Sequence, residues 1–242
     1  MGMRTSLMAL AAGATLVAGA AQADTITQQE NSVFGSNGSA NVSVNDSGFG
    51  GAGSSNVIAG AFALNSTNTS YTDAAGDFVA FCLDIFNNLN LGTRGDYEVT
   101  TTPYIGATTS SPGDISDRIG DVQRLFNTAY AGVDLSDDNQ SAGFQLALWE
   151  VVFEDSVSST GFDLASGDFT VTNASSSLRN TAQGYLDGIF GANTGNYQLT
   201  YLESTQGGQN LVTMAPIPLP AGGVLLLGAL GGLAVARRRR KA

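Results

Sequence analysis

The chain of 242 residues contains no histidine and only one cysteine, Cys82. Without histidine, neither a Ser-His-Asp nor a Cys-His catalytic arrangement can form, and no zinc or iron site can use imidazole ligands. A single cysteine cannot form an internal disulfide, whatever the redox state of the compartment. In an exported protein such a cysteine is buried, paired between molecules, or used chemically.

Lysine is absent from residues 24–215, and arginine occurs there at only four positions. All 21 carboxyl side chains lie in this region, which gives it a formal net charge of −17. Such a surface repels nucleic acid and anionic membranes, so we expect neither as a partner of this region. The charge suits a salty medium or an extracellular polysaccharide layer bridged by divalent cations. Solubility in an organism with an acidic proteome would explain it as well.

The first 23 residues have the composition of a secretory signal peptide. A positive charge at Arg4 precedes an apolar run, and the small-x-small sequence Ala21-Gln22-Ala23 follows it. This order predicts cleavage after Ala23, so that the mature protein begins at Asp24. Without these residues and the C-terminal segment described next, residues 24–215 remain as the exported body, the length of one domain or a tight pair.

Residues 216–242 form a second distinct segment. An uncharged stretch at 221–236 approaches the roughly 20 apolar residues of a membrane-spanning helix, so we predict a C-terminal transmembrane helix. The basic cluster that follows it is expected on the cytoplasmic side, with the body outside that membrane. The cluster consists of Arg237, Arg238, Arg239, Arg240 and Lys241.

This C-terminal segment resembles the PEP-CTERM class of bacterial sorting signals, in its variant with a Val-Pro-Leu-Pro-Ala box. The box here is Ile217-Pro218-Leu219-Pro220-Ala221, with Ile in place of Val. The resemblance implies a Gram-negative host and an exosortase-type processing enzyme as a partner. It implies a protein held first at the inner membrane, facing the periplasm, and later found at the cell surface or in the extracellular matrix.

Apolar periodicity within the body predicts an α+β fold, with antiparallel strands at both ends and about three amphipathic helices between them. Alternating or apolar runs indicate strands near 40–48, 56–67, 77–86, 95–104, 162–174, 196–204 and 209–216. Apolar residues at helical spacing indicate helices near 116–131, 140–154 and 176–190.

Two residues of this body have complementary chemistry. Cys82 lies in the strand-like sequence FCLDIF, and Gln145 interrupts the apolar helical sequence FQLALWEVVFE. A thiolate can attack a glutamine carboxamide, expel ammonia and leave an internal thioester, provided the two groups are held in near-attack geometry. Aromatic side chains of Phe81, Phe144 and Trp149 could exclude water from such a bond. The sequence leaves open whether the two residues meet or are two unrelated core residues.

The same motifs resemble the thioester domains of bacterial surface adhesins, over about residues 80–155. An aromatic-Cys-aliphatic-Asp strand precedes a helix with the pattern Gln-x-Ala-aliphatic-Trp, here Cys82 with Asp84 and Gln145 with Trp149. Phe144 stands where the adhesin pattern usually has Thr. The resemblance implies a Cys82–Gln145 thioester and an amine- or hydroxyl-bearing surface target, and therefore a covalent adhesin.

Other interpretations of the sequence remain. The protein could be a structural component of the exopolysaccharide matrix, with Cys82 simply buried. Asp134, Ser136 and Asp138 have the spacing of a loose calcium loop, or of an acidic helix start. Asp84, Glu150 and Glu154 are carboxylates that a glycosidase would need in pairs, although 21 acids make coincidence common. We expect neither enzymatic activity nor a cofactor or bound metal.

Overall fold

The computed structural model describes residues 24–29, 32–46, 53–85, 87–91, 95–100, 118–154 and 161–216. These residues form ten strands, three α-helices and one 3-10 helix. The strands are β1 (Asp24–Thr25), β2 (Thr27–Gln28), β3 (Ser39–Asp46), β4 (Gly53–Gly60), β5 (Phe62–Asn65), β6 (Asp77–Cys82), β7 (Asp96–Thr100), β8 (Phe169–Asn173), β9 (Tyr197–Ser204) and β10 (Leu211–Pro216). The helices are α2 (Ile119–Ala129), η1 (Tyr130–Gly132), α3 (Asp138–Phe153) and α4 (Ser176–Asp187).

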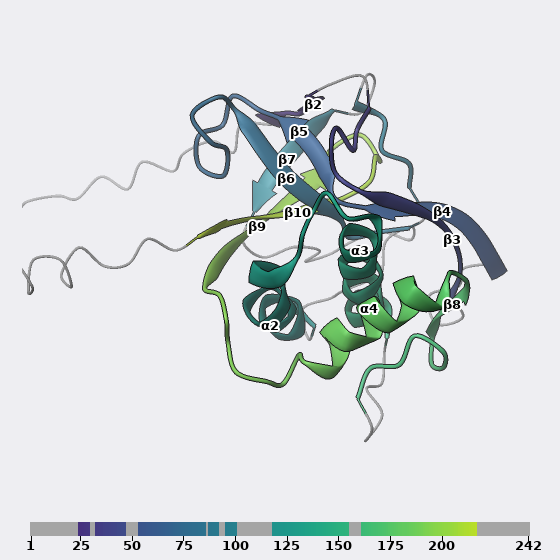
Figure 1. The fold of residues 1–242 in the computed structure, drawn as a ribbon. Coiled ribbons are helices and arrows are strands. Elements are labelled where there is room, and N and C mark those ends of the chain that lie inside the picture. Colours follow the sequence, from purple (N-terminus) through teal and green to yellow (C-terminus); the bar gives the residue numbers. More distant parts are fainter. Residues whose placement is uncertain are drawn as a thin grey trace, which may run out of the picture.

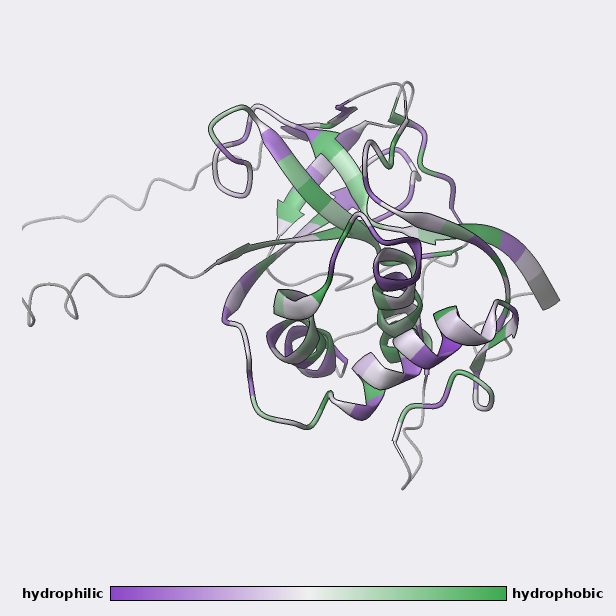
Figure 2. Cartoon of the chain, in the orientation of Figure 1, coloured by the Kyte–Doolittle hydropathy of each residue, from purple (hydrophilic) through white to green (hydrophobic). Residues whose placement is uncertain are grey.

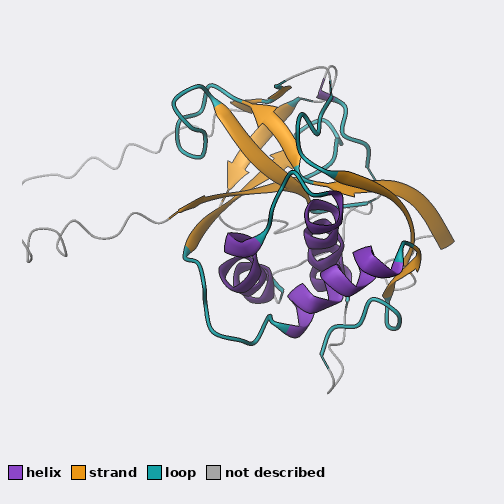
Figure 3. Cartoon of the chain, in the orientation of Figure 1, coloured by secondary structure: helices purple, strands orange, loops and turns teal. Residues whose placement is uncertain are grey.

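The larger sheet has seven strands in the order β1-β7-β9-β10-β6-β5-β2, and all its pairings are antiparallel. Strands β9 and β10 form a hairpin, and β10 also pairs with β6, where Leu211 lies opposite Cys82. Strand β6 therefore lies inside the sheet, between β10 and β5. Cys82 is its last residue and lies opposite Leu211, which is far away in the sequence. Figure 3 shows most of the strands on one side of the molecule and the helices on the other.

The smaller sheet contains three strands in the order β4-β3-β8. Strands β3 and β4 pair along their whole length, from Ser39 opposite Gly60 to Asp46 opposite Gly53. Strand β4 belongs to this sheet and β5 to the larger one, so the chain crosses between sheets at Ala61, the residue that separates them. This crossing shapes the site described below.

The three helices lie together against the sheets, with α3 between α2 and α4 in the view of Figure 1. Helix α3 begins at an N-cap, Asp137, whose side chain accepts a hydrogen bond from the backbone N–H of Gln140. From Ser141 to Phe153 every residue of α3 is buried, and Figure 2 shows the helix as mostly apolar. Helices α2 and α4, in contrast, each bury one stripe and expose the other face.

The predicted α+β arrangement, with strands at the two ends of the body and amphipathic helices between them, is wrong. The described structure is mainly sheet, with one sheet of seven strands and another of three, and α3 is buried around its whole circumference instead of exposing a polar face. The physical reason is that strand partners are distant in sequence, so local periodicity cannot show how many strands share a sheet or what covers them.

Within the described residues, no helix is both long enough and apolar enough to cross a membrane. The predicted C-terminal transmembrane helix, with its uncharged stretch at 221–236, lies outside the residues to which this finding applies. The expected signal peptide, cleavage site Ala23, sorting box 217–221 and basic cluster 237–241 all lie outside the described residues.

Close packing of backbone at Gly38 links the segment before β3 to the start of α3. The N–H of Gly38 donates to the carbonyl of Leu135, and a Cβ at this position would lie 2.6 Å from the backbone of Asp137 and Asp138. Because backbone cannot move aside as a side chain can, Gly38→Ala is expected to lower the free energy of unfolding by about 2–3 kcal/mol in urea denaturation.

Gly120 in helix α2 provides the matched control, because no described atom would lie within 4 Å of an added Cβ there. Gly120→Ala is expected to stabilise the protein by about 0.5–1 kcal/mol, since alanine has the higher helix propensity. Equal effects of the two substitutions would contradict the tight contact at Gly38.

Candidate functional site around Cys82 and Gln145

The backbone of Cys82 lacks a strand partner on one side. Leu83 donates its N–H to the carbonyl of Asn210 on the β10 side, so the N–H and C=O of Cys82 point toward the other edge of β6. On that edge β5 pairs with β6 only as far as Phe62 opposite Ala80. The residues before Phe62 belong to the smaller sheet, so β5 offers no partner to the N–H and C=O of Cys82. Because both groups are buried, they must be satisfied by other means.

The side chain of Gln145 satisfies both groups. Its Oε1 accepts a hydrogen bond from the N–H of Cys82 at 2.8 Å, and its Nε2 donates to the carbonyl of Cys82 at 2.8 Å. The carboxamide thus makes the two ladder hydrogen bonds to Cys82 that a longer β5 would have made. Both residues are only 1% exposed, so this exchange takes place away from solvent.

Other side chains support the same crossing. Ser141, one turn before Gln145 on α3, accepts a hydrogen bond from the N–H of Ala61 at 3.0 Å, and Asn37 donates to the carbonyl of Ala61 at 3.1 Å. Asp138, at the start of the helix, accepts from the N–H of Ser39 at 3.0 Å. Asp138, Ser141 and Gln145 follow one another at spacings of three and four residues, so they lie on one face of α3. This polar seam hydrogen-bonds the backbone at the ends of strands. This seam explains why a glutamine interrupts an apolar helix.

The thiol of Cys82 is held as a neutral group. Its Sγ donates to the carbonyl of Asp84. Burial raises the pKa of the thiol well above its ordinary value, and the charge of Asp84 raises it further. Hydrogen bonds that involve Trp149, the backbone of Asp84 and the side chain of Gln209 act in the opposite direction but do not outweigh burial.

Asp84 is buried beside the thiol and is itself perturbed. Burial raises the pKa of its carboxyl to about 6, although the backbone N–H groups of Asn210 and Asn87 donate to it and favour the charged form. Near neutral pH the carboxylate form still predominates. Asp84 is therefore the ionised group whose field acts on the sulfur.

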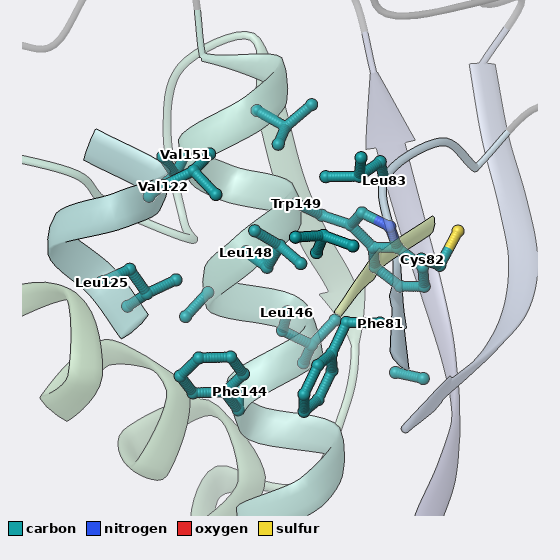
Figure 4. Packing of buried hydrophobic residues seen from close by; sticks show 14 of the residues in the cluster. Phe81, Cys82, Leu83, Val122, Leu125, Phe144, Leu146, Leu148, Trp149 and Val151 are labelled. Carbon is teal, nitrogen blue, oxygen red and sulfur yellow. The ribbon is translucent and has the colours of Figure 1, made fainter. Parts of the chain in front are cut away.

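The predicted aromatic surroundings divide between two faces of β6. Phe81 points to the face opposite Cys82, because successive strand residues alternate, and it packs on Phe144 with ring centroids 4.9 Å apart. Trp149, one turn after Gln145 on α3, instead reaches toward Cys82, whose sulfur points away from the helix (Figure 4). The indole Nε1 of Trp149 is buried and faces the Cys82 sulfur, and it meets no oxygen or nitrogen acceptor among the described residues.

Sequence reasoning brought Cys82, Gln145, Asp84 and Trp149 into one hypothesis, and the structure places these four side by side. It missed Gln209, whose Nε2 donates to the Asp84 carbonyl at 3.1 Å and whose side chain reaches the sulfur. Gln209 lies in the short connection between β9 and β10 and has no local motif. Only the pairing of β10 with β6 brings it to the site.

The remaining candidate residues have backbone partners. Asp134 accepts from the N–H and hydroxyl of Ser136, as in an acidic turn before α3. Glu150 accepts from the N–H of Asp163, and Glu154 accepts from that of Asp168. No group of three metal-ligating side chains occurs in the described part of the chain.

Comparison with known proteins adds only distant similarity. The sequence matches no model of a known protein family and no curated protein. Among solved structures, it is similar to the N-terminal domain of the Streptococcus pyogenes pilus tip adhesin Cpa, with a TM-score of 0.41 and 15% identity over 79% of this chain and 98% of that one. A similarity at this TM-score and identity shows no role for this chain.

Proposed function

We propose that this is an exported surface protein that attaches covalently to a target through a thioester between Cys82 and Gln145. The observation that carries the proposal is the pair of 2.8 Å hydrogen bonds that fix the Gln145 carboxamide on Cys82 in a site closed to water. The described conformation corresponds to the unreacted state, with the thiol bonded to Asp84. Formation of the thioester requires a rotation about the Cα–Cβ bond of Cys82 that brings the sulfur from the Asp84 carbonyl to the carboxamide carbon.

Formation of the bond follows the chemistry of acyl transfer. The sulfur attacks the carboxamide carbon of Gln145, the C–N bond breaks, and ammonia leaves with the proton that the thiol gives up. Because the thiol pKa is raised, a nearby base is needed, and the ionised Asp84 carboxylate can take up that proton in transit. Exclusion of water from the site protects the product from hydrolysis.

Capture of a target breaks the thioester, with Cys82 now as the leaving group. An amine or hydroxyl attacks the thioester carbonyl, the C–S bond breaks, and the thiol of Cys82 is restored as an amide or ester forms at Gln145. The leaving thiolate is stabilised by donors that already face the sulfur, the indole N–H of Trp149 and the amide of Gln209. The reaction occurs once per molecule, so the protein acts as a covalent adhesin and not as an enzyme.

The test is the intact mass of the exported protein, purified without reducing agents or amine buffers. We expect a mass lower than calculated by one ammonia, and methylamine treatment should add one methylamine at Gln145. In Cys82→Ala both the deficit and the adduct should be absent. A full calculated mass, with Cys82 unreactive toward alkylating agents until the protein is unfolded, would contradict the proposal.

A second function has an observation in its favour. In the described state every polar contact of the pair is satisfied without a covalent bond, because Gln145 completes the β6 edge and the thiol bonds to Asp84. The protein would then be a non-catalytic component of the extracellular polysaccharide matrix. The same mass measurement separates the two functions.

Sorting to the surface is a further part of the proposal. Its support is the order of box 217–221, uncharged stretch and basic cluster in the sequence. An exosortase-type enzyme would process the chain near this box. Alanine in place of both Pro218 and Pro220 should leave the unprocessed chain in the cell, as seen by immunoblotting of cell and medium fractions.

A further inference from the structure

A pocket of about 330 Å³ lies against the reactive pair. Its walls come from the β3–β4 hairpin, the segment before β3, the residues that follow β6, and α3. Trp149 and Gln209 form part of the lining, and both also reach the sulfur of Cys82. Trp149 and Gln209 are therefore common to the pocket wall and to the surroundings of the thiol, so a nucleophile that meets the thioester can enter from this side.

The lining of the pocket is neutral, in a body with a formal charge of −17. None of the described residues that line it carries a charge. A polyamine would need carboxylates at this point, and an acidic polymer would need arginine or lysine. Neither kind of ligand has a partner among the described residues of the pocket.

Carboxamides and aromatic rings supply the chemistry of the walls instead. Asn41, Asn56, Asn88 and Gln209 each offer both a donor and acceptors, which matches the two-way hydrogen bonding of hydroxyl groups. Phe34 and other apolar side chains line the rest of the pocket, where they can contact the C–H faces of a sugar ring.

Trp149 connects the pocket to the thiol. The residue is only 1% exposed and forms part of the pocket wall, and its indole N–H faces the Cys82 sulfur. A ligand in the pocket therefore lies against the side chain that faces the reactive sulfur.

A second hollow of about 490 Å³ is a neighbour of the pocket. The two share Val33 and Leu89, and the described lining of the second, which includes Thr27, Gln28 and Asn90, is also uncharged. The two hollows, called the groove below, offer more room than one sugar unit requires, which favours a chain of sugars over a single small molecule.

We propose that this groove binds a neutral polysaccharide and presents one of its hydroxyl groups to the thioester. The covalent step rests on the function proposed above. The hydroxyl oxygen attacks the Gln145 carbonyl, the C–S bond breaks, the hydroxyl proton passes to the Cys82 sulfur, and an ester links Gln145 to the sugar. Recognition by the groove does not need the thioester, so the two can be tested separately.

Binding is measured with the full chain carrying Cys82→Ala, on an array of neutral and acidic oligosaccharides and synthetic peptides. We expect binding to neutral oligosaccharides, and a loss of about tenfold or more in the Asn41→Ala/Asn88→Ala variant, which removes two carboxamides from the groove. The matched control is Asn193→Ala/Asn196→Ala, two exposed asparagines of the α4–β9 connection, and it should bind as the parent does.

The outcomes distinguish the two proposals. Neutral-sugar binding that depends on Asn41 and Asn88 supports the groove as a polysaccharide site. This holds even where the intact mass shows no thioester and the covalent function fails. A thioester by mass, with no binding of neutral sugars above that of the Asn41→Ala/Asn88→Ala variant, overturns the groove and leaves covalent capture standing. Preferential binding of peptides or acidic sugars also overturns it.

Discussion

Gln145→Leu is expected to lower the free energy of unfolding by about 3–5 kcal/mol, whether or not a thioester forms. The substitution keeps the apolar volume of the side chain but removes both hydrogen bonds to Cys82. The N–H and C=O of Cys82 are then buried without partners, and each such group costs roughly 1–3 kcal/mol. Urea denaturation of the thioester-free Cys82→Ala background, with and without Gln145→Leu, measures the effect.

Two further variants in the same background sharpen this result. Gln145→Glu keeps an acceptor for the Cys82 N–H, and only its protonated form can donate to the Cys82 carbonyl, so we expect a smaller loss than with leucine at acidic pH and a larger loss where the buried carboxyl ionises. Cys82→Ala itself should cost on the order of 1 kcal/mol, because it removes a small buried side chain and one hydrogen bond. A loss below 1 kcal/mol for Gln145→Leu would show that the seam of α3 does not complete the strand edge.

Glu150→Gln is expected to remove most of the loss of stability that the protein suffers between about pH 5 and pH 8. Burial raises the pKa of the Glu150 carboxyl from 4.5 to about 8, and the charges of Glu154 and Asp163 add to the shift, while the N–H of Asp163 opposes it. The folded state therefore holds a proton that the unfolded state releases. Its contribution is fully present below pH 4.5 and is lost as the pH rises through 8.

The size of this effect follows from linkage, at roughly 3–5 kcal/mol between the two limits. Denaturation across pH 4–9 should give a steep decline for the parent protein and a shallower one for Glu150→Gln. Asp84, with a pKa raised to about 6, contributes to the decline in both proteins, so the difference isolates Glu150. Glu98→Gln, at an exposed carboxyl of β7, should leave the profile unchanged. Parallel parent and Glu150→Gln curves would contradict the prediction.

Local patterns located many of the elements. The apolar spacing at 140–154 coincides with α3, and the two runs at 196–204 and 209–216 coincide with β9 and β10. The prediction of one strand at 56–67 is wrong, because this apolar run contains parts of two strands, β4 and β5, which belong to different sheets. Nothing local distinguishes Ala61 as the crossing point, since its partners are Ser141 and Asn37 from elsewhere in the chain.

The sequence by itself determined the chemistry available to this protein. The absence of histidine and the single cysteine excluded most catalytic sites, and the lone glutamine in an apolar helix pointed to a special contact. Only the tertiary structure decided what that contact is, because Cys82 and Gln145 are 63 residues apart and meet through a gap left by β5. The neutral groove was likewise invisible in a strongly acidic sequence, since its walls are single residues from separate segments that only folding brings together.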